Sequence, residues 1–229
     1  MSATTFPAVR DHVAEIRFDE ARHRYTRGGI VLPSVTRVLR AMGMSPFGTS
    51  PPAVISPKMQ VGTWIHDMMK LYFNGTLDSE KLSPPMRDIL DVTMAWMKEQ
   101  NLAAYVVEKP LAHSLFWYAG KPDVVCRDFP KDQIIVIDWK WGVPKPIDIL
   151  QLGGYCEMVR DCYGFRQGEV IGIPVYIRDL LAGKEPRRIR GKEMENAIAV
   201  FLSAHACYKW RLAHGLISSE DEEGEDEDE

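Results

Sequence analysis

The sequence predicts an α/β protein with a mixed β-sheet at its centre, and three observations carry this prediction. Residues 134–141 are β-branched and aromatic, and apolar on both faces at their start, which is typical of a central strand covered on both sides. The strands expected just before it are joined by short loops, which favours an antiparallel meander. The apolar run 169–177 is reached through a helix and can therefore pair in parallel with an earlier strand.

The N-terminal part of the chain predicts an extension that precedes this core. Residues 1–15 show little periodicity, and we expect them to be flexible. Residues 16–32 predict a hairpin that turns at Gly28-Gly29. Ser34 is placed to cap a following helix, and Arg37 lies off the apolar face of that helix. Arg37 is therefore either part of a solvated helix flank or a contact for phosphate.

The remaining elements follow in the order helix, strand, strand, strand, helix, strand. Their expected ranges are a proline-rich loop over 45–57, helices over 58–73 and 84–100, strands over 104–108 and 114–119 (or one long bent strand pair over both), strands over 123–126 and 134–141, a helix over 147–163, the strand over 169–177 and a last helix over 193–214. Gly153-Gly154 predicts a close approach of another backbone to the helix over 147–163. We expect one domain over residues 16–217 and a disordered acidic tail over 218–229.

Charge and composition are those of a globular protein with a weak preference for polyanions. Nine of the 32 acidic side chains lie between Glu220 and Glu229, so the remaining chain has 28 basic and 23 acidic side chains, a net charge of +5. A mildly basic body with an acidic tail suits a polyanion-binding protein, although many ordinary proteins carry such a charge. The tail is either solubilising or a competitor for a basic surface. No secretory signal or membrane-length apolar run is evident, so we expect a cytoplasmic location.

The four cysteines offer no pair with zinc spacing, and we expect them to be reduced and buried.

Acidic residues and a lysine gather where the predicted strands end. Asp138 and Lys140 are two apart on one strand and therefore share a face. Asp123 begins the preceding strand, and an antiparallel pair would bring it near both. Two carboxylates and a lysine form a hard-oxygen site for a divalent cation, with a cationic group for water or phosphate. A structural ion pair is the alternative for Asp138 and Lys140 alone.

These residues resemble the PD-(D/E)XK nuclease superfamily, in its RecB-like, phage-type exonuclease branch. Pro122-Asp123 and Asp138-Trp139-Lys140 match the two halves of the signature, and Gln151-Leu152-Gly153-Gly154-Tyr155 matches a QxxxY helix motif. Gly62-Thr63-Trp64-Ile65-His66 is similar to the upstream helix with its histidine, and the segment from Tyr25 to Thr36 to the opening of phage-encoded members. The resemblance implies a restriction-endonuclease-like core of order αβββαβ.

The resemblance also implies roles. Asp123, Asp138, His66 and the carbonyl of Trp139 would bind Mg²⁺ or Mn²⁺, and Lys140 would act on water and phosphate. Gln151 and Tyr155 would hold DNA or Lys140, with Ser34 and Arg37 as further candidates for substrate binding. Glu108 would be a ligand for a second metal, a hydrogen-bonding partner or an exposed residue. No cysteine pattern suits an iron–sulfur cluster.

We therefore expect a metal-dependent DNA exonuclease of a virus or mobile element, active in recombination or repair, with a strand-annealing recombinase as a possible partner. The alternatives are a structure-specific endonuclease on the same core and a catalytically silent DNA-binding or assembly module.

Overall fold

The centre of the protein is a mixed four-stranded sheet, described here from a computed structural model that covers residues 6–10, 15–44, 57–128 and 131–218. The strands are β4 (Leu102–Val107), β7 (Val124–Asp128), β8 (Gln133–Lys140) and β9 (Val170–Tyr176), in the spatial order β4-β7-β8-β9. β7 is antiparallel to both of its neighbours, β4 and β8, and β9 is parallel to β8. The predicted α/β class with a central mixed sheet is confirmed.

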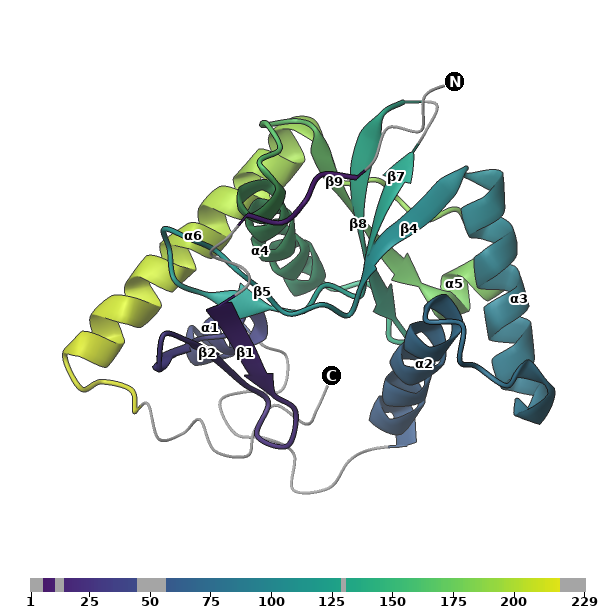
Figure 1. Cartoon of the computed structure of the whole chain (residues 1–229), viewed down its shortest axis with the longest axis horizontal. Helices are drawn as coiled ribbons and strands as arrows, with labels where there is room; N and C mark the ends of the chain where they lie inside the picture. The colour runs from purple at the N-terminus through teal and green to yellow at the C-terminus, as the bar shows by residue number, and fades with distance from the viewer. Residues whose placement is uncertain (1–5, 11–14, 45–56, 129–130, 219–229) are drawn as a thin grey trace.

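Helices cover both faces of this sheet (Figure 1). One face carries α4 (Pro146–Tyr163) and α6 (Gly191–Ala213), and the other carries α2 (Pro57–Phe73), α3 (Pro84–Glu99) and the short α5 (Ile177–Leu181). Because strand residues alternate, Ile134 and Val136 pack into the first layer, while Ile135, Ile137 and Trp139 pack into the second. The predicted burial of this strand on both faces is confirmed. α5, which begins at Ile177, was not predicted, and neither was the 3₁₀ turn Ser79–Lys81.

Helices α4 and α6 lie close together because α4 has no side chain at the point of contact. A Cβ atom on Gly153 would lie 2.8 Å from the backbone carbonyl carbon of Ala197 in α6. The predicted close approach at the glycine pair is thus confirmed. This packing holds the buried face of α4, with Gln151 and Tyr155, against the end of the sheet.

The N-terminal extension is a separate three-stranded sheet followed by a helix. β1 (Ile16–Asp19), β2 (Arg24–Arg27) and β3 (Ile30–Leu32) form an antiparallel meander that leads into α1 (Val35–Ala41). The predicted turn and cap are confirmed: Gly28 and Gly29 have positive φ angles, and the Ser34 hydroxyl accepts the N–H of Arg37 at 3.0 Å. Ahead of this sheet, in the segment expected to be flexible, Phe6 stacks on Tyr105 at 4.7 Å.

The predicted strand over residues 114–119 is wrong. The chain forms two short strands there, β5 (Leu111–Ala112) and β6 (Ala119–Gly120), with a turn between them. The ring nitrogen Nδ1 of His113 accepts the backbone N–H groups of Leu115 at 3.2 Å and Phe116 at 3.3 Å. Trp117 also takes a positive φ of 58°. Hydrogen bonds to the His113 ring therefore take the place of hydrogen bonds to a neighbouring strand. The apolar composition of the segment did not indicate this.

Other expectations meet the structure only in part. Cys126, Cys156 and Cys162 are buried free thiols as predicted, but Cys207 is exposed, because it lies on the outer side of α6. Most of the predicted loop over 45–57 and nearly all of the acidic tail lie outside the described residues. Among the residues that the structure describes, no helix has the length and apolar character needed to cross a membrane.

Candidate metal centre

Acidic residues from three strands meet at one edge of the central sheet. Glu108 directly follows β4, Asp123 directly precedes β7, and Asp138 lies near the end of β8. Val124 pairs with Ile137, so Asp123 and Asp138 are the next residues outward on the two antiparallel chains. The expected proximity of their backbones therefore follows from the register of β7 and β8.

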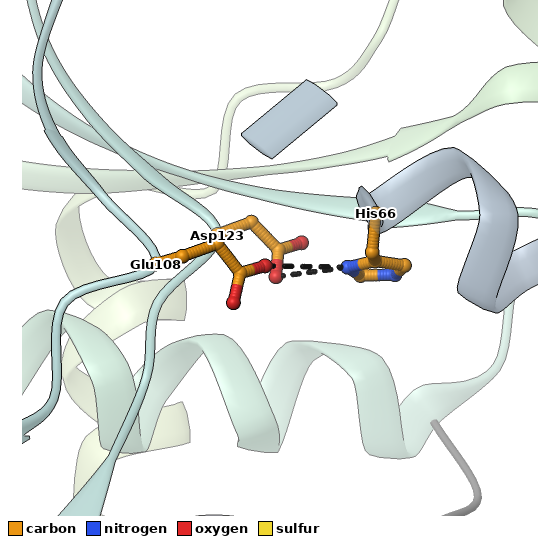
Figure 2. A group of neighbouring side chains, drawn as sticks. All are labelled: His66, Glu108 and Asp123. Carbon is orange, nitrogen blue, oxygen red and sulfur yellow. Dashed lines mark hydrogen bonds and ion pairs between the residues drawn. The ribbon is translucent and has the colours of Figure 1, made fainter. Parts of the chain in front are cut away.

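A histidine from α2 completes a cluster with two of these carboxylates. The Nδ1 atom of His66 lies 3.1 Å from Oδ1 of Asp123 and 3.8 Å from Oε1 of Glu108. The three potential ligand atoms lie within 4.8 Å of one another, and Figure 2 shows the imidazole directed toward the two carboxylates. One imidazole nitrogen with two carboxylate oxygens is a donor set for divalent cations such as Mn²⁺, Mg²⁺ or Zn²⁺. The residues present thus fit a divalent metal ion.

Without a bound metal, the electrostatics of the cluster favour the protonated form of His66 and the ionised form of Asp123. Burial by itself lowers the pKa of His66, but the charge and hydrogen bond of Asp123, with a contribution from Glu108, raise it well above the ordinary value. Burial raises the pKa of Asp123, but the charge of His66, the hydrogen bonds from His66 and Trp139 and the charge of Lys140 together lower it. A bound cation would take the place of the His66 proton.

Asp138 does not join this cluster, although it was predicted as a metal ligand. Its side chain is buried and pairs with the Lys140 ammonium at 3.0 Å. Lys140 also donates to the amide oxygen of Gln151 at 2.8 Å, and the Gln151 amide reaches the Tyr155 hydroxyl at 3.4 Å. The chain of contacts from Asp138 to Tyr155 therefore fixes the position of the Lys140 ammonium. Gln151 and Tyr155 lie on one helical face, as their spacing predicts.

Trp139 contributes to the site through its backbone. Its N–H donates to Oδ2 of Asp123 at 2.7 Å, and its side chain is buried on the opposite face of the sheet. This hydrogen bond leaves the other oxygen of Asp123 directed at His66. Asp123 is thus held by both of its oxygens.

Glu108, whose role the sequence left most open, lies inside the cluster and is held by a strained backbone. Its φ angle is +47°, and its N–H donates to the carbonyl of Asp123 at 3.0 Å. A left-handed conformation costs a residue with a side chain about 1 kcal/mol or more, and such residues gather at functional sites. Oε2 of Glu108 meets the Lys121 ammonium at 2.7 Å.

The cluster opens into a cleft of about 340 Å³ between the N-terminal sheet and α2. Ser34 and Tyr155 line this cleft, and so do Phe18, His23 and Lys121, to which the sequence analysis gave no role. Lys121 lies between β6 and β7, two residues before Asp123, where strand periodicity gives no indication of its direction.

Arg37, a candidate for substrate binding, is not part of the cleft lining. Its guanidinium donates to the Tyr208 hydroxyl at 3.0 Å, and it is thereby directed toward α6. The position of Arg37 off the apolar face of α1 is explained by this contact with a second helix.

Comparisons with known proteins add little to this geometry. A scan against models of protein families finds no match, and a search of curated protein sequences finds none either. Among solved structures, the chain is similar to the crystal structure of an alkaline exonuclease, LHK-Exo, from Laribacter hongkongensis, with a TM-score of 0.34 and 17% identity. The match covers 81% of this chain and 95% of that chain. A similarity this low assigns neither a family nor an activity, so the functional case depends on the site.

Proposed function

We propose that the protein is a divalent-metal-dependent deoxyribonuclease with a restriction-endonuclease-like core, and that it degrades DNA from its ends. The observation that carries this proposal is the placement of two distinct groups at one sheet edge. His66, Glu108 and Asp123 form a ligand set, and Lys140 stands beside it in a fixed position. A metal ligand set next to an oriented ammonium is a combination that suits phosphodiester hydrolysis, because both groups stabilise negative charge on the phosphate.

A divalent cation held by His66, Glu108 and Asp123 would polarise the phosphodiester and make water a better nucleophile. The chain itself supplies the remaining functions. Lys140, held by Asp138 and Gln151, offsets the negative charge that develops on the scissile phosphate. The Trp139 N–H fixes Asp123 before substrate arrives, so no reorganisation of this carboxylate is needed in the reaction.

DNA is the proposed substrate because the site and the charge of the chain agree. The cleft brings a metal site and the half-buried Lys121 together, and these suit a phosphate-bearing ligand. The net charge of +5 outside the acidic segment favours a polyanion. The exonuclease assignment draws on the resemblance of the Gln151–Tyr155 and His66 motifs.

The test compares end-labelled linear DNA with covalently closed circular DNA, in Mg²⁺, Mn²⁺ or EDTA. Linear DNA should be shortened progressively with either metal and survive in EDTA, while closed circles remain intact. The matched variant is Asp123→Asn, which should cleave neither substrate. Nicking of closed circles at a comparable rate would replace the exonuclease by an endonuclease. Full cleavage in EDTA, or by the variant, would contradict the metal-dependent mechanism.

A further inference from the structure

The Lys121 ammonium occupies the side of Glu108 that faces away from His66. Oε1 of Glu108 is directed at His66, at 3.8 Å, while Oε2 contacts Lys121 at 2.7 Å. On its other side, Lys121 lies over the ring of Phe18 in β1, with its Nζ atom 5.3 Å from the ring centre. The ammonium is therefore held between a nearly buried carboxylate and an aromatic face.

A second divalent cation in this site would need carboxylate oxygens that other cations already hold. One oxygen of Glu108 is paired with Lys121, and one oxygen of Asp138, Oδ2, is paired with Lys140. Both oxygens of Asp123 have partners as well. In two-metal phosphoryl-transfer sites, carboxylates bridge or divide between ions about 3.5–4 Å apart. Here the ammonium groups of Lys121 and Lys140 contact carboxylates that a second ion would need as ligands.

The formal charges lead to the same conclusion. The buried and half-buried charged groups of the centre comprise three carboxylates and two ammonium groups, Glu108, Asp123, Asp138, Lys121 and Lys140, which give a net charge of −1 with neutral His66. One divalent cation changes this to +1, and one phosphodiester then neutralises it. Two divalent cations would give +3 in a partly buried site, where like charges repel strongly.

Other charges in the cleft do not alter this count. Glu20 and Lys70 pair with each other at 3.3 Å, and Asp67 is exposed to solvent. Exposed charges act weakly through water.

We infer that Lys121 is a positioning residue that restricts the centre to a single divalent cation, with its ammonium in place of a second ion. The inference rests on the proposed metal-dependent function, and it fixes how that function is carried out. Lys121 holds Glu108 as a ligand through one oxygen and supplies a permanent positive charge beside the substrate phosphate. Replacing Lys121 by an uncharged side chain of similar shape should open a second metal site.

The experiment measures Mn²⁺ bound per full-length chain, without DNA, from the free-ion signal in electron paramagnetic resonance up to millimolar Mn²⁺. Wild-type protein should bind one ion, and Lys121→Met should bind two, with first-site affinity raised by about tenfold or more. Lys121→Arg, which keeps the charge, should bind one ion. Lys81→Met is the matched control, because it removes an exposed lysine that pairs with Asp78 outside the cleft, and it should also bind one.

Two ions on wild-type protein, or one ion on a folded Lys121→Met variant, would overturn the inference. Thermal unfolding monitored by circular dichroism establishes whether each variant is folded. If the methionine variant is not folded, the arginine variant gives an independent reading. Wild-type protein that binds no Mn²⁺ would contradict the proposed metal-dependent function as well. Metal-dependent cleavage of linear DNA by wild-type protein with two bound ions would leave the function in place and remove only the single-ion assignment.

Discussion

Replacing Asp123 by asparagine removes one negative charge from the metal centre and keeps its shape. The amide oxygen can still accept the Trp139 N–H, which meets Oδ2 at 2.7 Å in the wild-type protein. The amide nitrogen then faces Nδ1 of His66, at the 3.1 Å now spanned by Oδ1, and can donate to it when the imidazole is neutral. The variant therefore loses stability only where His66 is protonated.

The two pKa shifts determine the pH range in which the contact between His66 and Asp123 stabilises the folded protein. The pKa of His66 is raised in the folded protein, so its contribution is fully present below its ordinary value of 6.5 and is lost as the pH rises through the folded pKa. The pKa of Asp123 is lowered, so its contribution is present above its ordinary value of 3.8 and is lost as the pH falls through the folded pKa. Both contributions are fully present between these two ordinary values.

The magnitude is that of a hydrogen bond to a charged group, about 1.5–3 kcal/mol. For a chain of this length, 1 kcal/mol lowers the melting temperature by about 2–4 °C, so Asp123→Asn should melt roughly 3–12 °C below wild type at a pH near 5.5. The measurement is thermal unfolding in EDTA at acidic, neutral and alkaline pH. This result also bears on an alternative, in which removing a carboxylate relieves repulsion and stabilises the metal-free protein.

The control is Asp78→Asn, because Asp78 is exposed and pairs with Lys81 on the surface. It should change the free energy of unfolding by no more than about 0.5 kcal/mol at any pH. An Asp123→Asn variant as stable as wild type near pH 5.5 would refute the argument. A loss of stability that persists undiminished at alkaline pH would refute it too, because it would then not depend on the charge of His66.

Three further outcomes are expected. Lys140→Met should bind Mn²⁺ and DNA as wild type does, yet cleave about 100-fold more slowly or worse in single-turnover assays; a loss confined to DNA affinity would make Lys140 a phosphate contact only. His66→Ala should weaken Mn²⁺ binding and flatten its increase with pH, because the metal binds the neutral imidazole, and equal pH dependence in titrations of both proteins would exclude His66 as a ligand. Gly153→Ala should destabilise the fold by about 1–3 kcal/mol in denaturant unfolding, because the new Cβ meets the backbone of α6 at 2.8 Å. The control is Gly62→Ala in α2, which should be neutral or slightly stabilising because the space at its Cβ is open. Equal effects of the two glycine substitutions would contradict the packing argument.

The parts of the fold that the sequence predicted are those in which local pattern and tertiary packing agree. β8 is apolar at consecutive positions because helices cover both of its faces, and the same burial makes it recognisable as a central strand. The cap of α1 was predictable because Ser34 forms its hydrogen bond within three residues. The turn after Ala112 was not, because the acceptor that determines it is the ring of His113, a residue outside the run that looked like a strand.

In the candidate site, sequence spacing predicted which residues share a strand face. It did not predict which side chains contact one another. The two-residue periodicity of strands places Asp138 and Lys140 on one face, and the register of β7 and β8 brings Asp123 beside them. Spacing does not say which carboxylate pairs with which cation, because that depends on the ends of side chains from separate elements. Asp138 contacts Lys140 at 3.0 Å and Asp123 contacts His66 at 3.1 Å, and the metal-ligand role of both carboxylates stays a prediction.

Lys121 and Glu108 show why such contacts matter for mechanism. The resemblance indicated Glu108 without fixing its role and gave Lys121 no role, yet their contact at 2.7 Å places a positive charge next to the cluster. Two lysine ammonium groups beside three carboxylates leave an excess of one negative charge with neutral His66, and one divalent cation together with one phosphodiester would bring the sum to zero. A bound divalent cation would raise the charge of the centre to +1, and a bound phosphodiester would return it to zero, so metal and substrate should each strengthen the binding of the other.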